Sequence, residues 1–457
     1  MARSRLLLAL TFLAAIPLVA LARAPLTGPL AEYVAAKDDS YGWVKRSEGS
    51  VLTCKYVELT LTSQTWRGIV WKHQLFLVKP GRVNEAAKHA TLMIAGGSWR
   101  DELADPKTQI KLPAEAYALA AVAEAQQSPV AILLHVPQQP IFDGKREDQI
   151  IAYTFREFLK SGDETWPLLE PMVKSAVRAM DATQEALKKE WGLDVERFTV
   201  TGASKRGWTT WLTAAADDRV AAIAPMVINM LNMSPHTKAQ RVAFAGQPSE
   251  QIDDYQGLDE YLDTPRGQLL RKIVDPWEYR QRLELPKLVI LGTNDRYWPL
   301  DSSNLYWNDL VGEKYLLFVP NAGHDLKDRA RVIAGLSALN RSVISGKPLP
   351  KFDWKYADGR GAEGRGGVQL RITSNPPPTR VRIWTASAAT RDFRESPWKA
   401  TDAAASDGAW LHHHANPATG LSALLGELVF NEGTENEFSL STDVRIVAAP
   451  TAAAGGK

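Results

Sequence analysis

The chain has 457 residues, of which 45% are hydrophobic and 23% charged, so it has ample material for one or more globular cores. Its 54 basic and 52 acidic residues give a formal net charge of +2, which offers no reason to expect nucleic acid as a partner. The single cysteine, Cys54, excludes an intramolecular disulfide. Its strand-like setting favours a small buried side chain over a thiol nucleophile.

The N-terminus is typical of an export signal. Two arginines precede the apolar stretch LLLALTFLAAIPLVALA, and a small-residue site follows that ends at Ala24. We predict a signal peptide over residues 1–24, with cleavage after Ala22 as the alternative because Pro25 follows Ala24. A membrane anchor is the other reading, but the run is marginal in length for a bilayer and contains a proline. We expect a periplasmic or secreted protein with no membrane span after signal removal.

Apolar strand patterns alternate with helical patterns from the signal to residue 346. The strand patterns lie within 50–66, 68–80, 90–102, 129–137, 197–217, 219–228, 287–295 and 314–325, and the helical ones at 112–127, 147–159, 168–191 and 325–346. Buried strands that alternate with helices indicate a mostly parallel sheet covered on both faces. We therefore predict an α/β domain over residues 25–346.

Two further regions lack this alternation of strand and helix patterns. Residues 230–286 are polar and partly helical, which predicts a cap-like insertion over the strand ends. Residues 351–449 contain short alternating strands between clusters of Gly, Pro, Asn and Ser, a pattern typical of a small β-sandwich. The tail, residues 450–457, is of low complexity, and we expect it to be disordered.

The stretch TGASKRGW places Ser204 between a predicted strand and a predicted helix. A serine on such a turn is typical of the nucleophile elbow, where a helix N-terminus faces developing negative charge. The usual second glycine would stand at Arg206, but here Gly207 comes one residue later. A plain helix N-cap is the alternative role for Ser204.

A serine nucleophile needs a base and an acid that orients the base. Asp295 follows the strand in KLVILGTND, and His324 follows the strand in KYLLFVPNAGHD, in the chain order of serine, acid and histidine. Asp301 is the rival acid, whereas Asp325 is less suited because side chains of neighbouring residues usually diverge. We predict a Ser204–His324–Asp295 triad.

The oxyanion hole is expected from two backbone amides. One is that of Lys205, which follows the nucleophile, and the other that of Gly97 in the loop LMIAGGSWRDE. Glycines let backbone N–H groups approach a ligand closely, although a plain tight turn is the alternative. Further candidate substrate contacts are Gly96, Ser98, Trp99, His135, Arg206 and His236.

The sequence predicts no metal site and no cofactor. The run His412-His413-His414 could recruit a metal, but a structural or solvated segment is favoured because no acidic or cysteine spacing completes a site. Gly96 and Gly97 lack the context of a dinucleotide-binding loop.

Long segments of the chain carry a family resemblance. These are TGASKRGWTTWL, IIAYTFREFL, SGDETWPLLEPMVKSAVRAMD, LHVPQQPIF, LGTNDRYWPLDSSN, FVPNAGHDL and TRVRIWTASAATRDFRESPW. With them the chain resembles the PhoPQ-activated pathogenicity-related (PqaA-type) proteins. The resemblance implies an α/β-hydrolase domain, a C-terminal β-sandwich, export, and a link to antimicrobial-peptide resistance. The elbow is also similar to the G-x-S-R-x-G pattern of glucuronoyl esterases, but Lys205 stands where they have the arginine.

Three functions follow from these residues. The first is an exported serine hydrolase acting on small peptides or esters, with a peptidase favoured by the resemblance. The second is an esterase of the glucuronoyl type, with tryptophans as sugar platforms. The third is a non-catalytic binding or signalling protein on a hydrolase fold, suggested by the displaced glycine, Gly207. The oligomeric state does not follow from the sequence.

Overall fold

The computed structural model describes residues 25–105, 107–108, 112–360 and 366–450. The segment predicted as a signal peptide and all but the first residue of the predicted tail lie outside the described residues. Within the described ranges, no helix combines the length and the apolar character needed to cross a membrane.

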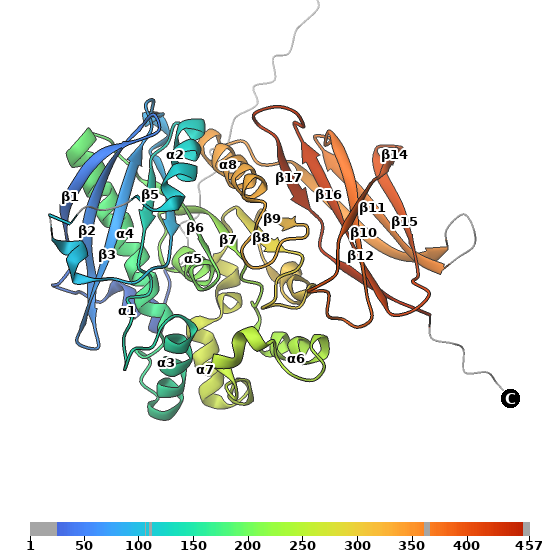
Figure 1. Cartoon of the computed structure of the whole chain (residues 1–457), viewed down its shortest axis with the longest axis horizontal. Coiled ribbons are helices and arrows are strands. Elements are labelled where there is room, and N and C mark those ends of the chain that lie inside the picture. The colour runs from blue at the N-terminus through green and yellow to red at the C-terminus, as the bar shows by residue number, and fades with distance from the viewer. Residues whose placement is uncertain (1–24, 106, 109–111, 361–365, 451–457) are drawn as a thin grey trace, which may run out of the picture.

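Strands β1 to β9 form the central part of a large sheet, in the order β1-β2-β3-β5-β4-β6-β7-β8-β9 (Figure 1). Pairing is antiparallel from β1 to β5 along this order and parallel from β5 through β4 to β9. The bounds are β1 Gly42–Val51, β2 Cys54–Trp66, β3 Ile69–Lys79, β4 His89–Ile94, β5 Val130–Leu133, β6 Arg197–Ala203, β7 Val220–Met226, β8 Lys287–Gly292 and β9 Lys314–Val319. Parallel strands end at one common edge, which is where ligands bind in open α/β sheets.

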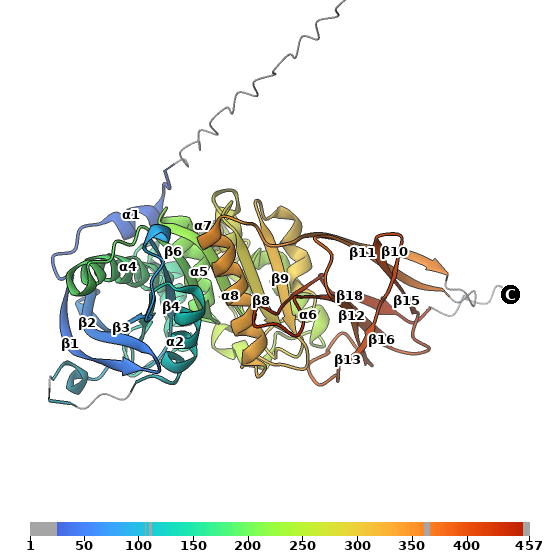
Figure 2. The ribbon, with the colours of Figure 1, turned by 90° about the horizontal axis from the view of Figure 1, so that it is seen from above.

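Helices cover both faces of this sheet, as Figures 1 and 2 show. On one face α1, α4 and α5 pack together, and on the other α2 and α8 do. Helix α5 lies between the sheet and α4 and is buried on nearly all sides. The bounds are α1 Pro29–Ala35, α2 Ala114–Gln126, α3 Asp148–Ser161, α4 Leu169–Trp191, α5 Lys205–Ala216 and α8 Arg329–Ser345.

The segment between β7 and β8 forms the cap, with helices α6 Met233–Ala243 and α7 Pro265–Val274. Short 3-10 turns at Glu250–Tyr255, Asp259–Tyr261 and Pro276–Arg282 connect them to each other and to β8. The buried carboxylate of Asp275 accepts amide hydrogen bonds from Asn232 at 3.1 Å and from Met233 at 2.7 Å. This carboxylate therefore ties the end of α7 to the start of α6.

The C-terminal part is a two-layered β-sandwich fused to the central sheet. One layer has the order β10-β11-β15-β14, and the other β17-β16-β12-β13 with β18 on β16. Its strands are β10 Lys351–Arg360, β11 Gly366–Asn375, β12 Arg380–Ala388, β13 Lys399–Asp402, β14 Ala404–Ser406, β15 Ala409–Ala415, β16 Leu421–Phe430, β17 Phe438–Ser441 and β18 Arg445–Ala448.

Strand β17 joins the two parts, because it pairs antiparallel with β9 through Ser441 and Leu316. A shared hydrophobic cluster includes Leu288 and Leu317 of the central sheet together with Leu424 of the sandwich. The architecture is an α/β-hydrolase fold with a helical cap and a C-terminal β-sandwich, and it confirms the predicted fold class.

Candidate active site

Ser204 occupies the sharp turn between β6 and α5. Its backbone has φ 58° and ψ −127°, a conformation that a residue with a side chain keeps only when its surroundings enforce it. The turn is tight, because a Cβ on Gly202 would lie 2.7 Å from the carbonyl oxygen of Arg206. A Cβ on Gly207 would lie 2.8 Å from the carbonyl oxygen of Met226. Gly207 therefore supplies the second close approach of this elbow, one residue later than in the usual pattern.

Asp295 and His324 are hydrogen-bonded at the carboxyl ends of β8 and β9. The Nδ1 atom of His324 lies 2.9 Å from Oδ2 and 3.1 Å from Oδ1 of Asp295. The ring of Tyr297 stacks on His324 with 4.0 Å between centroids, and the Tyr297 amide donates to Asp295 Oδ1 at 2.9 Å. The Nε2 atom of His324 is buried and has no hydrogen-bond partner among the described residues. The ring is thus oriented by the carboxylate and leaves Nε2 for another group.

The rival acids lie in other surroundings. The carboxylate of Asp301 forms an ion pair with Arg391 of the sandwich. Asp325 is exposed. Among the three carboxylates, Asp295 is the one that the structure joins to His324.

The predicted oxyanion residues are Lys205, which follows Ser204 directly, and Gly97, which follows the strand next to β6. Lys205 is the first residue of α5, so its amide has no acceptor one turn earlier in the helix. Gly97 follows β4, the neighbour of β6, and has φ 117°. A Cβ on Gly97 would lie 2.8 Å from His135 Nδ1, and one on Gly96 2.7 Å from Arg206 Nη2. Gly97 is therefore required by its positive φ and by the nearby His135 ring, whereas at Gly96 the atom in the way is the end of the Arg206 side chain.

The side chains of Lys205 and Arg206 are bound in a charge cluster with two carboxylates at the start of α3. Lys205 Nζ lies 3.0 Å from Glu147 and 2.9 Å from Asp148. Arg206 Nη2 lies 2.7 Å from Glu147, and its Nε donates to the carbonyl oxygen of Val136 at 2.6 Å. The side chains of Lys205 and Arg206 are 8% and 11% exposed. Arg206 is therefore tied to α3 and packs against the glycine loop.

This cluster keeps Glu147 ionised. Burial raises the pKa of Glu147, but the hydrogen bond and charge of Arg206, together with the charge of Lys205, outweigh burial and lower the pKa to about 2. The sequence predicted a helix from residue 147, but no local spacing links its first carboxylates to the elbow. Glu147 and Asp148 were therefore missed as parts of the site.

Three of the predicted substrate contacts lie in the glycine loop or against it, outside the cavity. His135 is buried, and its Nε2 lies 2.9 Å from the Gln74 side-chain oxygen. The Trp99 ring meets His135 edge-on, with 5.9 Å between centroids. The Ser98 hydroxyl accepts a hydrogen bond from Arg146 at 2.6 Å. These side chains support the loop, and none of the three is among the residues that line the cavity described next.

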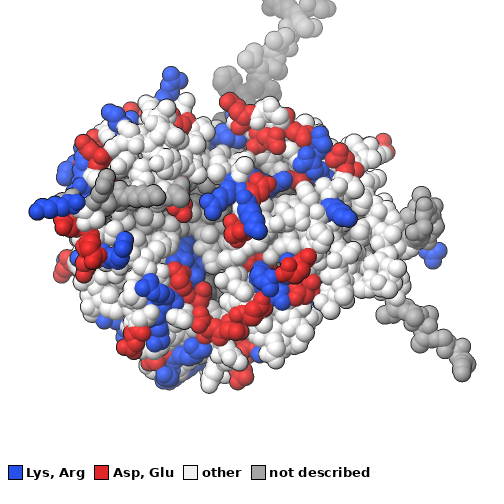
Figure 3. Space-filling view, viewed as in Figure 1, with Lys and Arg blue, Asp and Glu red and all other residues white. Residues whose placement is uncertain are grey.

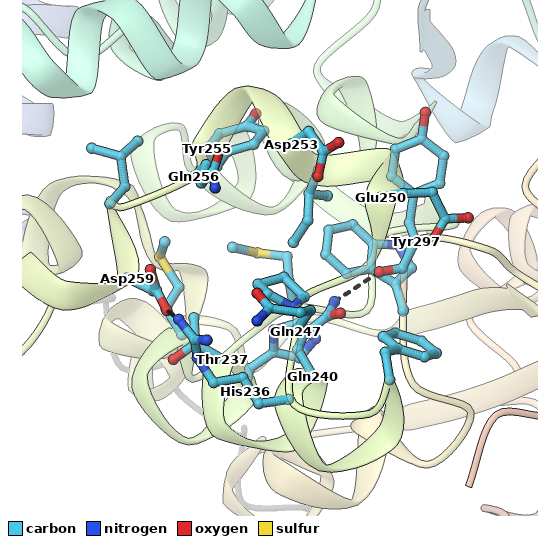
Figure 4. A pocket seen from close by; sticks show the side chains of 18 of the residues that line it. His236, Thr237, Gln240, Gln247, Glu250, Asp253, Tyr255, Gln256, Asp259 and Tyr297 are labelled. Carbon is cyan, nitrogen blue, oxygen red and sulfur yellow. Dashed lines mark hydrogen bonds and ion pairs between the residues drawn. The ribbon is translucent and has the colours of Figure 1, made fainter. Parts of the chain in front are cut away.

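A cavity of about 1010 Å³ is lined by Ser204 on one side and by residues of the cap on the other. Figure 4 shows cap residues of its lining, such as His236, Gln247 and Asp259. Lys205 and Trp208 line it beside Ser204. The apolar part of its lining comes mostly from the cap and the strand before it, with Phe155, Ile228, Met230, Met233, Phe244, Leu258, Leu262 and Leu270. A cavity of this size and character fits a small organic substrate.

His236 of α6 lies in the cavity lining, beside Thr237 and Gln240 (Figure 4). Its ring packs edge-on against Trp298 with 5.4 Å between centroids, and its buried Nε2 has no partner among the described residues. Burial lowers the pKa of His236 to about 3, so the ring is neutral at ordinary pH. Of the predicted substrate contacts, His236 is the one in the cavity lining.

The cavity wall carries an excess of carboxylates. They are Asp148, Glu250, Asp253, Asp259, Glu260 and Asp392, and the cations among the lining residues are Lys205, Arg241 and Arg394. Figure 3 shows a row of acidic side chains in the lower centre of the face it draws. Among the described residues, Asp253 and Glu260 have no ion-pair partner, whereas Asp259 pairs with Arg241. The wall is therefore net negative.

The histidine run lies far from this site, on β15. His414 Nε2 is 2.8 Å from the Ser422 hydroxyl. In the part of the chain that the structure describes, no group of three or more His, Cys, Asp or Glu side chains is arranged to hold a metal ion.

Comparisons with known proteins point to one family. The family described as PhoPQ-activated pathogenicity-related protein matches residues 30–394. The chain is 35% identical over 387 residues to autocrine proliferation repressor protein A of Dictyostelium discoideum, a match that covers 80% of this chain and 76% of that protein.

Solved structures with a similar fold include two esterases. Acetyl xylan esterase 1 from Thermoanaerobacterium sp. JW/SL YS485 is 16% identical, with a TM-score of 0.43, over 68% of this chain and 95% of that one. The glucuronoyl esterase from Solibacter usitatus is 14% identical, with a TM-score of 0.43, over 68% of this chain and 91% of that one.

Proposed function

The chain belongs to the family of PhoPQ-activated pathogenicity-related proteins, and we propose that it is a serine hydrolase with Ser204 as nucleophile and His324 as general base. Asp295 would orient His324. One observation carries the proposal: Ser204 stands on a strained elbow, and at the same edge of the sheet a histidine bonded to a carboxylate has its second ring nitrogen unoccupied.

The proposed reaction has two halves. The Ser204 hydroxyl attacks the substrate carbonyl carbon and gives its proton to His324 Nε2, while Asp295 stabilises the imidazolium through Nδ1. The amides of Lys205 and Gly97 would donate to the oxyanion. Collapse of the tetrahedral intermediate breaks the bond to the leaving group, which takes the proton from His324. Water, deprotonated by His324, then hydrolyses the acyl-enzyme and restores Ser204.

A fluorophosphonate probe tests this proposal, because it phosphonylates serines activated by a neighbouring base. We expect rapid labelling of the wild type and none of Ser204→Ala, with Asp295→Asn slowed by about a hundredfold or more. Ser342→Ala, which removes a partly exposed hydroxyl on α8, is the matched control and should label like the wild type. Equal labelling of the wild type and Ser204→Ala would refute the proposal and favour a binding protein on this fold.

The proposed substrate is a small peptide, favoured by the net negative cavity wall, since carboxylates such as Asp253 and Glu260 attract cationic groups. An ester is the alternative with the same chemistry. Paired substrates with one cationic or one neutral side chain, each as an aminoacyl coumarin amide and as a p-nitrophenyl ester, separate these classes. Turnover of acyl or glucuronoyl esters without any cleavage of amides would replace the peptidase by an esterase.

We also propose that the protein is exported, on the strength of the sequence pattern over residues 1–24. N-terminal sequencing of the protein recovered from the periplasm or medium should begin at or shortly after residue 23. Recovery of the full chain with Met1 from the cytoplasm alone would contradict export.

A further inference from the structure

The loop between β12 and β13, residues 389–398, leaves the sandwich and packs against the candidate active site. Its side chains Phe393 and Trp398 are buried in the same hydrophobic cluster as the core of the α/β part. Thr390, Asp392 and Arg394 of this loop line the cavity that contains Ser204. The C-terminal part thus contributes directly to the surroundings of the site.

The loop is bonded to the residue before the acid. Asn294 Nδ2 lies within hydrogen-bond distance of three loop carbonyl oxygens, at 2.8 Å from Ser396, 3.2 Å from Arg394 and 3.4 Å from Phe393. The backbone N–H of Asn294 donates to the carbonyl oxygen of Ala322, which stands two residues before His324. A shift of the loop would therefore move the backbone that carries Asp295.

The loop is also bonded to the segment that carries the base. Asn321 Nδ2 donates to the carbonyl oxygen of Trp398 at 3.0 Å, and Asn321 Oδ1 accepts from the Trp398 amide at 2.7 Å. The backbone N–H of Asn321 donates to Thr293 Oγ1 at 2.9 Å. This bond links the loop that carries Asp295 to the loop that carries His324. The φ of 57° at Asn321 shows that this segment makes a sharp turn before His324.

Ion pairs bind the same loop at its edges. Arg391 pairs with Asp301, and Glu395 pairs with Arg296, which follows Asp295. Arg394 pairs with Glu250 of the cap at 2.7 Å. The loop therefore contacts the acid loop, the base loop and the cap together.

We propose that the β12–β13 loop positions the acid and the base of the active site. Asn294 and Asn321 are the positioning residues, because they bond this loop to the segments that carry Asp295 and His324. The loop fixes the backbone on which Asp295 and His324 stand, so the geometry of the acid–base pair depends on the C-terminal sandwich. This inference rests on the proposed function, because it assigns a role in the same reaction.

The test compares four variants in the full chain: Asn294→Ala, Asn321→Ala, Asn321→Asp and Asn304→Ala. Asn304 is the matched control, because its Nδ2 also bonds to the C-terminal part, at 3.0 Å from the carbonyl oxygen of Val444, but it lies outside segments 293–298 and 319–326, which carry the acid and the base. Fluorophosphonate labelling rates are measured across pH, and hydrogen–deuterium exchange is followed in peptides that cover residues 293–298 and 319–326.

We expect Asn294→Ala and Asn321→Ala to slow labelling by about tenfold to a hundredfold, since small displacements of catalytic groups are costly. Both should change the pH at which labelling is half maximal and speed exchange in the two peptides. Asn321→Asp keeps the oxygen that accepts from the Trp398 amide but replaces the Nδ2 donor by an oxygen that faces the Trp398 carbonyl. It should therefore still slow labelling, although by less than Asn321→Ala. Asn304→Ala should stay within about twofold of the wild type.

Two results overturn the inference while the proposed function stands. One is labelling of Asn294→Ala and Asn321→Ala at the wild-type rate and pH dependence. The other is equal slowing in Asn304→Ala, which would assign the effect to general loosening of the two parts. If an asparagine variant fails to fold, the exchange and labelling data of Asn321→Asp decide alone, and wild-type behaviour there overturns the inference. Absence of labelling in the wild type would remove the proposed function itself.

Discussion

Replacing Glu147 by glutamine tests the charge cluster beside the turn at Ser204. The carboxylate lies 2.7 Å from Arg206 and 3.0 Å from Lys205, two cations that are almost fully buried. Glu147→Gln keeps the shape of the side chain but removes the charge, and it turns an amide donor towards one of two groups that can only donate. Lys205 would retain Asp148, whereas Arg206 would keep no charged partner among its described contacts.

The magnitude follows from the pKa of the carboxylate. A fall from the ordinary 4.5 to about 2 corresponds to at most about 3 kcal/mol of stabilisation. Because the Glu147 side chain is 38% exposed, solvent screens the cluster, and we expect about 1–2 kcal/mol. The lowered pKa sets the direction with pH: this stabilisation is fully present above about pH 4.5 and is lost as the pH falls towards about 2.

Urea unfolding followed by tryptophan fluorescence measures the effect. At about pH 7 the midpoint of Glu147→Gln should be lower than that of the wild type, and the difference should shrink at about pH 3. Glu157→Gln is the matched control on the same helix, because Glu157 pairs with Lys160, whose side chain is 71% exposed. It should cost no more than about 0.5 kcal/mol. A loss for Glu147→Gln that equals the control, or that persists unchanged at about pH 3, would refute the reasoning.

Two further substitutions probe the loop and the cavity. Gly97→Ala should lower the labelling rate by about tenfold or more and the stability by about 1–2 kcal/mol, because φ is 117° and the new methyl group would meet His135 at 2.8 Å. Gly68→Ala, at φ 75° with open space around it, is its control and should leave the labelling rate unchanged; an equal fall in both would show that the space near His135 is irrelevant. His236→Leu should raise KM for the cleaved substrate. It should leave the free energy of unfolding at about pH 7, measured by urea titration, unchanged or up to about 1 kcal/mol higher, since it removes a buried nitrogen with no partner among the described residues. The difference in stability between His236→Leu and the wild type should grow towards about pH 5, because burial lowers the pKa of His236 to about 3 whereas an unfolded histidine binds a proton near 6.5. A variant that is less stable than the wild type at about pH 5 would contradict this.

Local patterns in the sequence were enough to predict the α/β part. The strand before Ser204 and those before Asp295 and His324 are short apolar runs that end in polar loops, and each signal is contained within a few residues. Parallel strands carry their ends to one edge, so chain order alone predicted which side chains share that edge. Strand β16, Leu421–Phe430, escaped prediction because it is buried on both faces and lacks the alternation expected in a sandwich.

The parts of the site that were missed depend on contacts between distant segments. Glu147 meets Lys205 and Arg206 only because α3 folds back over the elbow, and nothing local to either segment encodes that approach. The same holds for Asn294 and Asn321, whose partners lie in the β12–β13 loop. Polar side chains next to strand ends were visible in the sequence, but their acceptors are backbone carbonyl groups, which carry no side-chain signature.

These distant contacts explain how the elbow tolerates a bulky residue where the usual pattern has a glycine. Arg206 finds room because Gly96 has no Cβ, and its charge is neutralised by Glu147 from α3. The close approach that the missing glycine would have allowed is provided by Gly207 against the carbonyl oxygen of Met226. The residues that follow Ser204 are therefore packed against three separate segments, which are the loop after β4, the start of α3 and the end of β7, and the Ser204 amide itself donates to the carbonyl oxygen of Met226. The later position of the second glycine is thus compensated by these contacts and gives no reason to regard the elbow as inactive.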